Sequence, residues 1–286
     1  MSASASPSFR GRKLPPSIVE AIQRMEMPLS PDSYANLYYK SLPEMSEIRR
    51  NQPTGATYSN SPLVQDVVGT IALVRGDGYA ENTTEDYLSR CATGLILLGL
   101  GASDEAHDLV SPLSWPNELP FAYGPPVAVP EHVLCLASYV HALVHRREGP
   151  HPSEFGMKGF ANADYWAGSA LRSPDGAEAL PLEEIRASIV TLATQHASYS
   201  QDKDVQDWVQ QSVSGVDLQF PVWDPRVLNE LCSDLYNAST NTSTNSNTIG
   251  SNSTKLQEFA EQAVLTEMRI LLKHTLLAIG YEDCSA

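Results

Sequence analysis

Three side chains on one predicted helix have the types and spacing needed to bind a metal ion. His141, His145 and Glu148 occur at positions i, i+4 and i+7 of the segment HALVHRRE. On an α-helix these positions lie within about 60° of one another, so the three side chains share one side. Two imidazoles and a carboxylate on adjacent turns can reach one divalent ion. The spacing therefore indicates a divalent metal as the cofactor class, with all three side chains as ligands.

A fourth group comes from an earlier segment of the chain. His107 lies in a short predicted helix that precedes the one carrying His145, and we expect it to face the same interior point as a further ligand. An ion bound there with an open position would hold a water and lower its pKa, which makes that water a nucleophile. In this hypothesis His145 and Glu148 are also the acid and base groups, and the pocket is hydrolytic. Asn162 and Tyr165, on the next predicted helix, would orient the ligands.

A purely structural interpretation of the same residues is left open. The pattern H-x-x-x-H-x-x-E is less specific than H-E-x-x-H, and His145 and Glu148 would then simply bridge to Asn162 or Tyr165 by hydrogen bonds. Arg147 also has two interpretations. It clamps a bound carboxylate or phosphate, or, like its neighbour Arg146, it pairs with one of the many acidic residues.

Helical periodicity predicts the elements that must position these side chains. Four segments form two pairs, over about 84–100 and 104–110 and then 131–148 and 160–171, with Pro112 closing the second segment. Further helices are expected near 182–196, 227–236 and 256–279. No convincing strand pattern occurs, so we expect an all-α fold, an irregular bundle of paired helical hairpins.

The predicted organisation is one helical domain with a tail and an insertion. Residues 1–16 are rich in Ser and Pro and read as a disordered tail before a helical domain over 17–236. Residues 237–254 form a low-complexity Asn/Ser/Thr insertion. A helix over 255–280 is expected to pack back on the same domain.

Composition excludes several classes of function. There are 19 basic and 34 acidic residues, which gives a net charge of −15, so the chain is predicted to bind neither nucleic acid nor an anionic membrane. The four cysteines lack paired spacing and read as free thiols in a reducing compartment. The opening residues lack an apolar signal region. We expect a cytoplasmic protein, with import into an organelle as the second interpretation.

The motifs also resemble a family of uncharacterised all-α proteins. The resemblance rests on the leucine-rich segment that ends in ASDEAH at His107, on HALVHRRE and on NADYW, and it covers residues 85–171. It implies a helical fold and brings no activity with it. This chain departs from the family pattern at Tyr139–Val140, at Ala106, where the pattern has Ser, and in the longer loop before Asn162. The helix pairs are also weakly similar to tetratricopeptide hairpins.

Two functions from different classes follow. The first is a helical protein whose His/Glu pocket binds a small molecule or a divalent metal and is hydrolytic. The alternative is a non-catalytic module whose hairpins bind a protein partner, with structural histidines. The sequence leaves open which of these holds, whether the protein is an enzyme, and its oligomeric state.

Overall fold

The fold is all-α in the part of the chain that the structure describes. The computed structural model describes residues 12–30, 33–34, 83–115, 129–151, 157–200, 203–208, 223–240 and 254–282. These ranges hold ten helices and no strand. An isolated parallel bridge joins Arg12 to Tyr281 and ties the start of the described chain to the end of its last helix. The all-α prediction is therefore confirmed.

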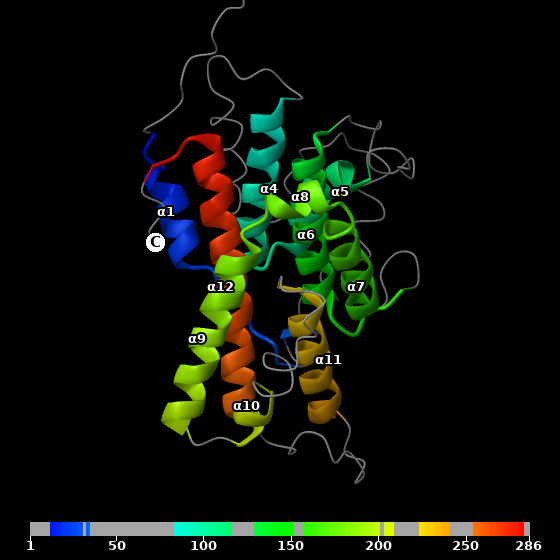
Figure 1. Ribbon diagram of the computed structural model, residues 1–286, viewed down its shortest axis with the longest axis vertical. Coiled ribbons are helices and arrows are strands. Elements are labelled where there is room, and N and C mark those ends of the chain that lie inside the picture. Colours follow the sequence, from blue (N-terminus) through cyan, green and yellow to red (C-terminus); the bar gives the residue numbers. More distant parts are fainter. Residues whose placement is uncertain are drawn as a thin grey trace, which may run out of the picture.

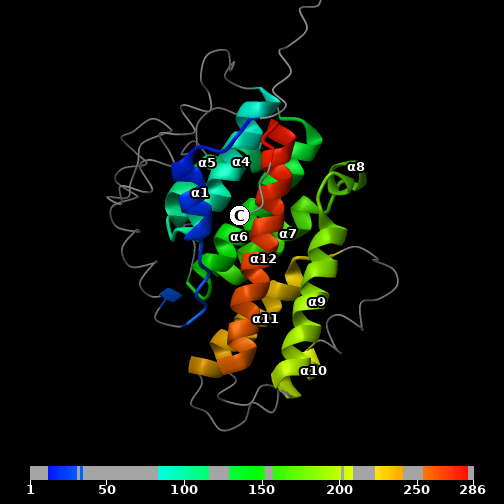
Figure 2. The same cartoon turned by 90° about the vertical axis from the view of Figure 1, so that its left-hand side faces the viewer.

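The helices form two groups along one long central helix. In chain order they are α1 (Pro16–Gln23), α4 (Thr84–Gly99), α5 (Ser103–Ser114), α6 (Glu131–Glu148), α7 (Gly159–Ala170), α8 (Pro174–Glu178), α9 (Leu182–Ser200), α10 (Lys203–Trp208), α11 (Arg226–Thr240) and α12 (Thr254–Ile279). α12 runs along the long axis of the molecule, with α1 and α4 beside its C-terminal half and α9 and α10 beside its N-terminal half (Figures 1 and 2). α5, α6 and α7 form the other part of the bundle.

Helix α6 is the centre of that second part. It packs against α5 and α7 and also against α4 and α8. Nearly every side chain from Val133 to Arg147 is buried, so polar side chains on this helix must find partners inside the protein. The helix ends at Gly149, whose φ of 65° lies in the left-handed region that favours glycine. Its boundaries are those predicted from the sequence.

Helix α5 extends further than the sequence predicts. The prediction that Pro112 closes it is wrong: the helix continues to Ser114, with Pro112 inside its last turn. A proline there removes one hydrogen bond, and its fixed φ is compatible with the helix. The Ser114 hydroxyl donates to the carbonyls of Val110 and Ser111, both at 3.1 Å, and this stabilises the final turn.

A close approach between α6 and α7 depends on one glycine. A Cβ atom on Gly159 would lie 2.6 Å from the carbonyl oxygen of His145 and 2.7 Å from that of Gly149. The backbone N–H of Phe160 donates to the Gly149 carbonyl at 2.9 Å. The absence of a side chain at Gly159 therefore lets the start of α7 rest on the end of α6, where the candidate site lies.

The predicted tail and insertion fall largely outside the described residues. Residues 1–11 and 241–253 lie outside the part of the chain that the structure describes. At the insertion the boundary differs from the prediction, because α11 continues through Asn237 to Thr240. Among the described residues, no helix combines the length and apolar character needed to cross a membrane.

Candidate functional site

Three histidine rings meet where α5 packs on α6. The ring centroid of His107 lies 4.7 Å from that of His141 and 5.4 Å from that of His145, and the last two rings stack at 4.6 Å. One ligand nitrogen from each ring can be chosen so that all three lie within 4.8 Å of one another. All three side chains are buried. The structure thus brings together the three imidazoles that the sequence analysis singled out.

A chain of polar contacts links His141 and His145 from the interior toward the surface. Nδ1 of His141 lies 2.8 Å from the hydroxyl of Ser114. Nε2 of His141 lies 2.9 Å from Nε2 of His145, whose Nδ1 lies 2.6 Å from a carboxylate oxygen of Glu148. Ser114 reaches this chain of contacts because α5 continues past Pro112. The sequence analysis missed this residue because it expected the helix to end at the proline.

The position of Glu148 changes its predicted role. Its carboxylate contacts Nδ1 of His145, on the other edge of the ring from Nε2, which faces His141. One ion cannot be bound by Nε2 of His145 and by this carboxylate in that arrangement. Glu148, with its side chain 23% exposed, is therefore placed to orient His145, and not to share an ion with its Nε2 as the sequence analysis expected.

The Glu148 contact also sets the proton positions on the rings. A carboxylate accepts hydrogen bonds, so Nδ1 of His145 donates its proton and a neutral His145 carries a lone pair on Nε2. Without a cation, Nε2 of His141 must then donate to Nε2 of His145, which leaves Nδ1 of a neutral His141 as an acceptor. The single Ser114 proton is then donated to that nitrogen in place of the carbonyls of Val110 and Ser111. Burial, followed by the neighbouring His145 and His107, lowers the pKa of His141 well below its usual value, which keeps that ring neutral.

Asn162 and Trp166 bring α7 into the site. The Asn162 amide nitrogen lies 3.0 Å from Nε2 of His145, as the hydrogen-bonding interpretation of the sequence predicts. The indole of Trp166 stacks on His141 with centroids 4.1 Å apart and an interplanar angle of 21°. Trp166 is buried, and its closest ring contact is a site histidine.

Tyr165 lies one ring further from the histidines. Its side chain is 45% exposed, and its ring meets Trp166 edge to face at 5.1 Å and lies 6.5 Å from Trp115. Trp115 in turn meets Trp166 at 4.8 Å. Tyr165 therefore supports the aromatic wall beside His141 and does not contact the imidazoles directly in the way predicted for an orienting group.

The two arginines of α6 face away from the histidines. Arg147, predicted as a clamp for a bound anion, donates instead to the backbone carbonyl of Pro28, away from the histidine cluster. Burial lowers its pKa to about 10, although nearby acidic groups oppose the shift. Arg146 forms a fully buried ion pair with Glu267, a residue that also accepts from the Tyr139 hydroxyl at 2.7 Å. This matches the pairing interpretation for Arg146, and no local pattern in the sequence pointed to Glu267 as its partner.

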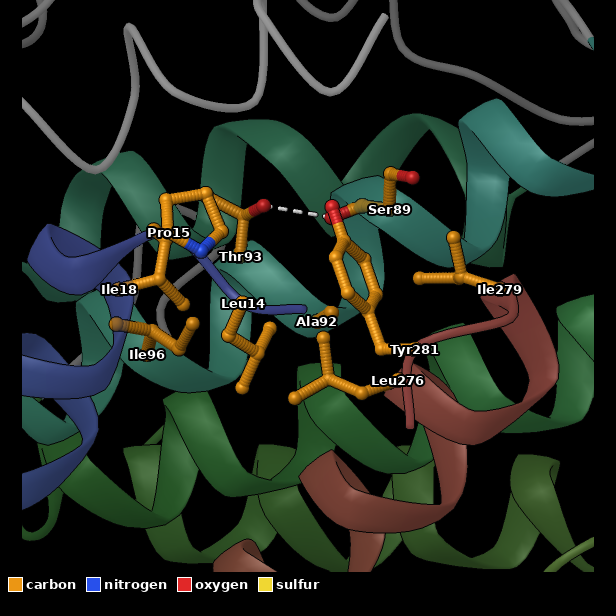
Figure 3. A pocket seen from close by; sticks show the side chains of 10 residues that line it. All are labelled: Leu14, Pro15, Ile18, Ser89, Ala92, Thr93, Ile96, Leu276, Ile279 and Tyr281. Carbon is orange, nitrogen blue, oxygen red and sulfur yellow. Dashed lines mark hydrogen bonds between the residues drawn. The ribbon is translucent and has the colours of Figure 1, made fainter. Parts of the chain in front are cut away.

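A separate cavity lies among α1, α4 and α12 and is not part of the site. It has a volume of about 30 Å³ and its walls include Leu14, Ile96 and Leu276 (Figure 3). The hydroxyls of Ser89 and Thr93 at its edge donate to carbonyls of their own helix. The cavity therefore presents an apolar surface with few polar groups to bind a ligand.

Comparison with known proteins provides no assignment. No family model, no curated protein and no solved structure matches the chain. The chemistry of the site must therefore be argued from its own residues.

Proposed function

We propose that the protein binds one divalent transition metal, of the zinc class, through His107, His141 and His145, and that a water on the metal gives the site hydrolytic chemistry. The observation that carries this proposal is the convergence of three buried imidazoles whose ligand atoms lie within 4.8 Å of one another. Three protein ligands with a fourth position for water is the usual composition of a catalytic zinc site, and structural sites have four protein ligands.

The distance between the two α6 imidazoles supports a shared ion. Zinc–nitrogen bonds of about 2.0–2.1 Å at a tetrahedral angle place two nitrogens about 3.3 Å apart. The Nε2 atoms of His141 and His145 lie 2.9 Å apart, so small ring rotations that move these atoms apart by about 0.4 Å reach the distance that a shared zinc requires. The ion would replace the proton that these two nitrogens share.

The outer contacts support the same role. Glu148 accepts the Nδ1 proton of His145, which is the carboxylate–histidine arrangement common around protein-bound zinc. The Ser114 hydroxyl can accept from Nδ1 of His141 while it donates to the backbone, which leaves Nε2 free for the metal. Each ring of α6 thus has a partner that aims its lone pair at the same point.

Metal binding requires one change at Asn162. Its amide nitrogen donates to the lone pair of His145 that the metal would use. A half-turn of the amide exchanges nitrogen and oxygen, which have nearly the same size, and then presents the oxygen to the cation. The proposal therefore includes this rotation when the ion binds.

Equilibrium dialysis of the full-length protein against zinc, followed by elemental analysis, tests the proposal. We expect one zinc per chain in the wild type and a large loss in His107→Gln and His141→Gln. His196→Gln is the matched control, because His196 bonds Gln262 on another part of the molecule and its loss should leave zinc binding unchanged. Circular dichroism verifies that each variant is folded.

The competing function is a metal-free interaction module, and it follows from the same contacts. His141 and His145 are already hydrogen-bonded to Ser114, Glu148 and Asn162 without any ion. In that case the wild type binds no zinc, and His141→Gln lowers stability only. Absence of stoichiometric zinc from the folded wild type would therefore refute the metal proposal and favour the interaction module.

A further inference from the structure

We infer that Ser111 holds the water or small anion that completes the coordination of the proposed metal. This inference rests on the metal site proposed above and adds the residue that defines its open position. It depends on two observations, namely the face of α5 on which Ser111 lies and the burial of its hydroxyl without a hydrogen-bond partner among the described residues.

Ser111 lies on the face of α5 that meets the histidines. Residues 107, 111 and 114 fall within about 60° of one another on a helix, and both His107 and Ser114 contact the His141 ring. The adjoining face of α5 is taken by α4, since a Cβ atom on Gly94 would meet Val110 at 2.9 Å and the Ala106 carbonyl at 3.6 Å. Ser111 therefore belongs to the side of α5 that faces α6.

The Ser111 hydroxyl is buried without a hydrogen-bond partner among the described residues. Its side chain is 1% exposed, and its oxygen is inaccessible to solvent. The buried helical hydroxyls of Thr93 and Thr275 instead donate to the carbonyl four residues earlier, at 2.6 and 2.7 Å. Buried polar groups in native proteins nearly always have a partner, so we assign the Ser111 hydroxyl a partner that is not a protein group.

A ligand on the metal supplies that partner. A hydroxyl both donates and accepts, so Ser111 can accept from a bound water or donate to a bound anion. Three neutral imidazoles leave the ion with its full charge of two, which favours a small anion in the open position. The expected ligands are thus water, hydroxide and small monoanions, and azide is a suitable probe.

Azide titration of the cobalt-loaded, full-length protein, followed by visible absorption, tests the assignment. Ser111→Ala should bind the same amount of cobalt as the wild type and should bind azide about 2- to 12-fold more weakly, the equivalent of one hydrogen bond. Ser111→Thr should recover the affinity because it keeps the hydroxyl. Ser89→Ala, which removes a buried hydroxyl bonded to the Glu85 carbonyl in α4, should bind azide like the wild type.

Thermal melts of the metal-free proteins provide a second readout. Removing an unpaired buried hydroxyl should leave the Tm of Ser111→Ala equal to or above that of the wild type. A lower Tm would show a structural partner for the hydroxyl and overturn the inference. Wild-type azide affinity in Ser111→Ala, or a cobalt protein that binds no azide at all, would overturn it while leaving the metal site intact. Failure of the wild type to bind cobalt would overturn both.

Discussion

Replacing Glu148 by Gln separates the orienting role of this carboxylate from the role of a direct ligand. The substitution keeps the size of the side chain and an oxygen that can accept from Nδ1 of His145, and it removes the charge. The contact is 2.6 Å long, with side-chain exposures of 4% for His145 and 23% for Glu148. Because the pair is largely shielded from solvent, the charge contributes substantially to this hydrogen bond.

The expected magnitude follows from that contact. A hydrogen bond to a charged group contributes about 1.5–3 kcal/mol, and a neutral acceptor retains about half of this. The difference is about 0.75–1.5 kcal/mol, which weakens zinc affinity about 4- to 12-fold. Loss of a direct carboxylate ligand would have a larger effect. The free energy of unfolding of the metal-free protein should fall by about 1 kcal/mol or less.

Competition with a chromophoric zinc chelator measures this affinity. Glu131→Gln is the control, because it removes the same charge from the exposed first turn of α6, about 15 Å along the helix from His141. It should bind zinc like the wild type. A Glu148→Gln protein within twofold of the wild type, or an equal loss in Glu131→Gln, would refute the orienting role of Glu148.

Three further predictions concern the packing and titration of the same region. Gly159→Ala should lose about 1–3 kcal/mol of stability and bind zinc more weakly, because its Cβ pushes α7 away from backbone carbonyls of α6. Gly168→Ala, with open space around it in α7, should be neutral or stabilising by up to about 1 kcal/mol. Equal urea midpoints for the two variants would contradict this. The pKa of His141 is lowered in the folded protein, so the unfolded chain protonates this ring more readily. The free energy of unfolding should therefore be constant above about pH 6.5 and fall toward lower pH by up to about 1.4 kcal/mol per pH unit. In urea unfolding, chelator-treated His141→Gln should show a smaller fall, and an unchanged fall would contradict the role of His141. Glu267→Leu leaves the Arg146 charge buried without a partner and should lower the free energy of unfolding by about 3–5 kcal/mol in chemical denaturation. The double variant with Arg146→Met should recover most of this loss. An equally unstable double variant would show that the loss does not come from the unpaired charge.

Local periodicity was sufficient to predict the fold class and the helix that carries the site. The apolar stripe of α6 and its stop at Gly149 define that helix, and the 3.6-residue period places His141 and His145 on one side. These features depend on residues close in sequence, where helical geometry leaves little choice. The contact of His107 with His141 and His145 does not follow from local periodicity, because it requires α5 to pack on α6 in one particular register.

Features that depend on long-range packing or rotamers lay beyond the sequence. Spacing alone does not tell which ring nitrogen of His145 meets Glu148, because this is set by the rotation of both side chains. The partner of Arg146 lies 121 positions away at Glu267, and no local pattern links the two. Ser114 was missed because proline usually ends a helix, and here α5 continues past it.

X-ray absorption at the zinc edge of the loaded, full-length protein measures the ligands around the proposed ion. We predict one zinc per chain with three imidazole nitrogens at about 2.0–2.1 Å and one further light ligand. In His107→Gln the imidazole number should fall by one or the metal should be lost. A zinc environment of oxygen ligands without imidazoles, or a folded protein that retains no zinc, would contradict the account.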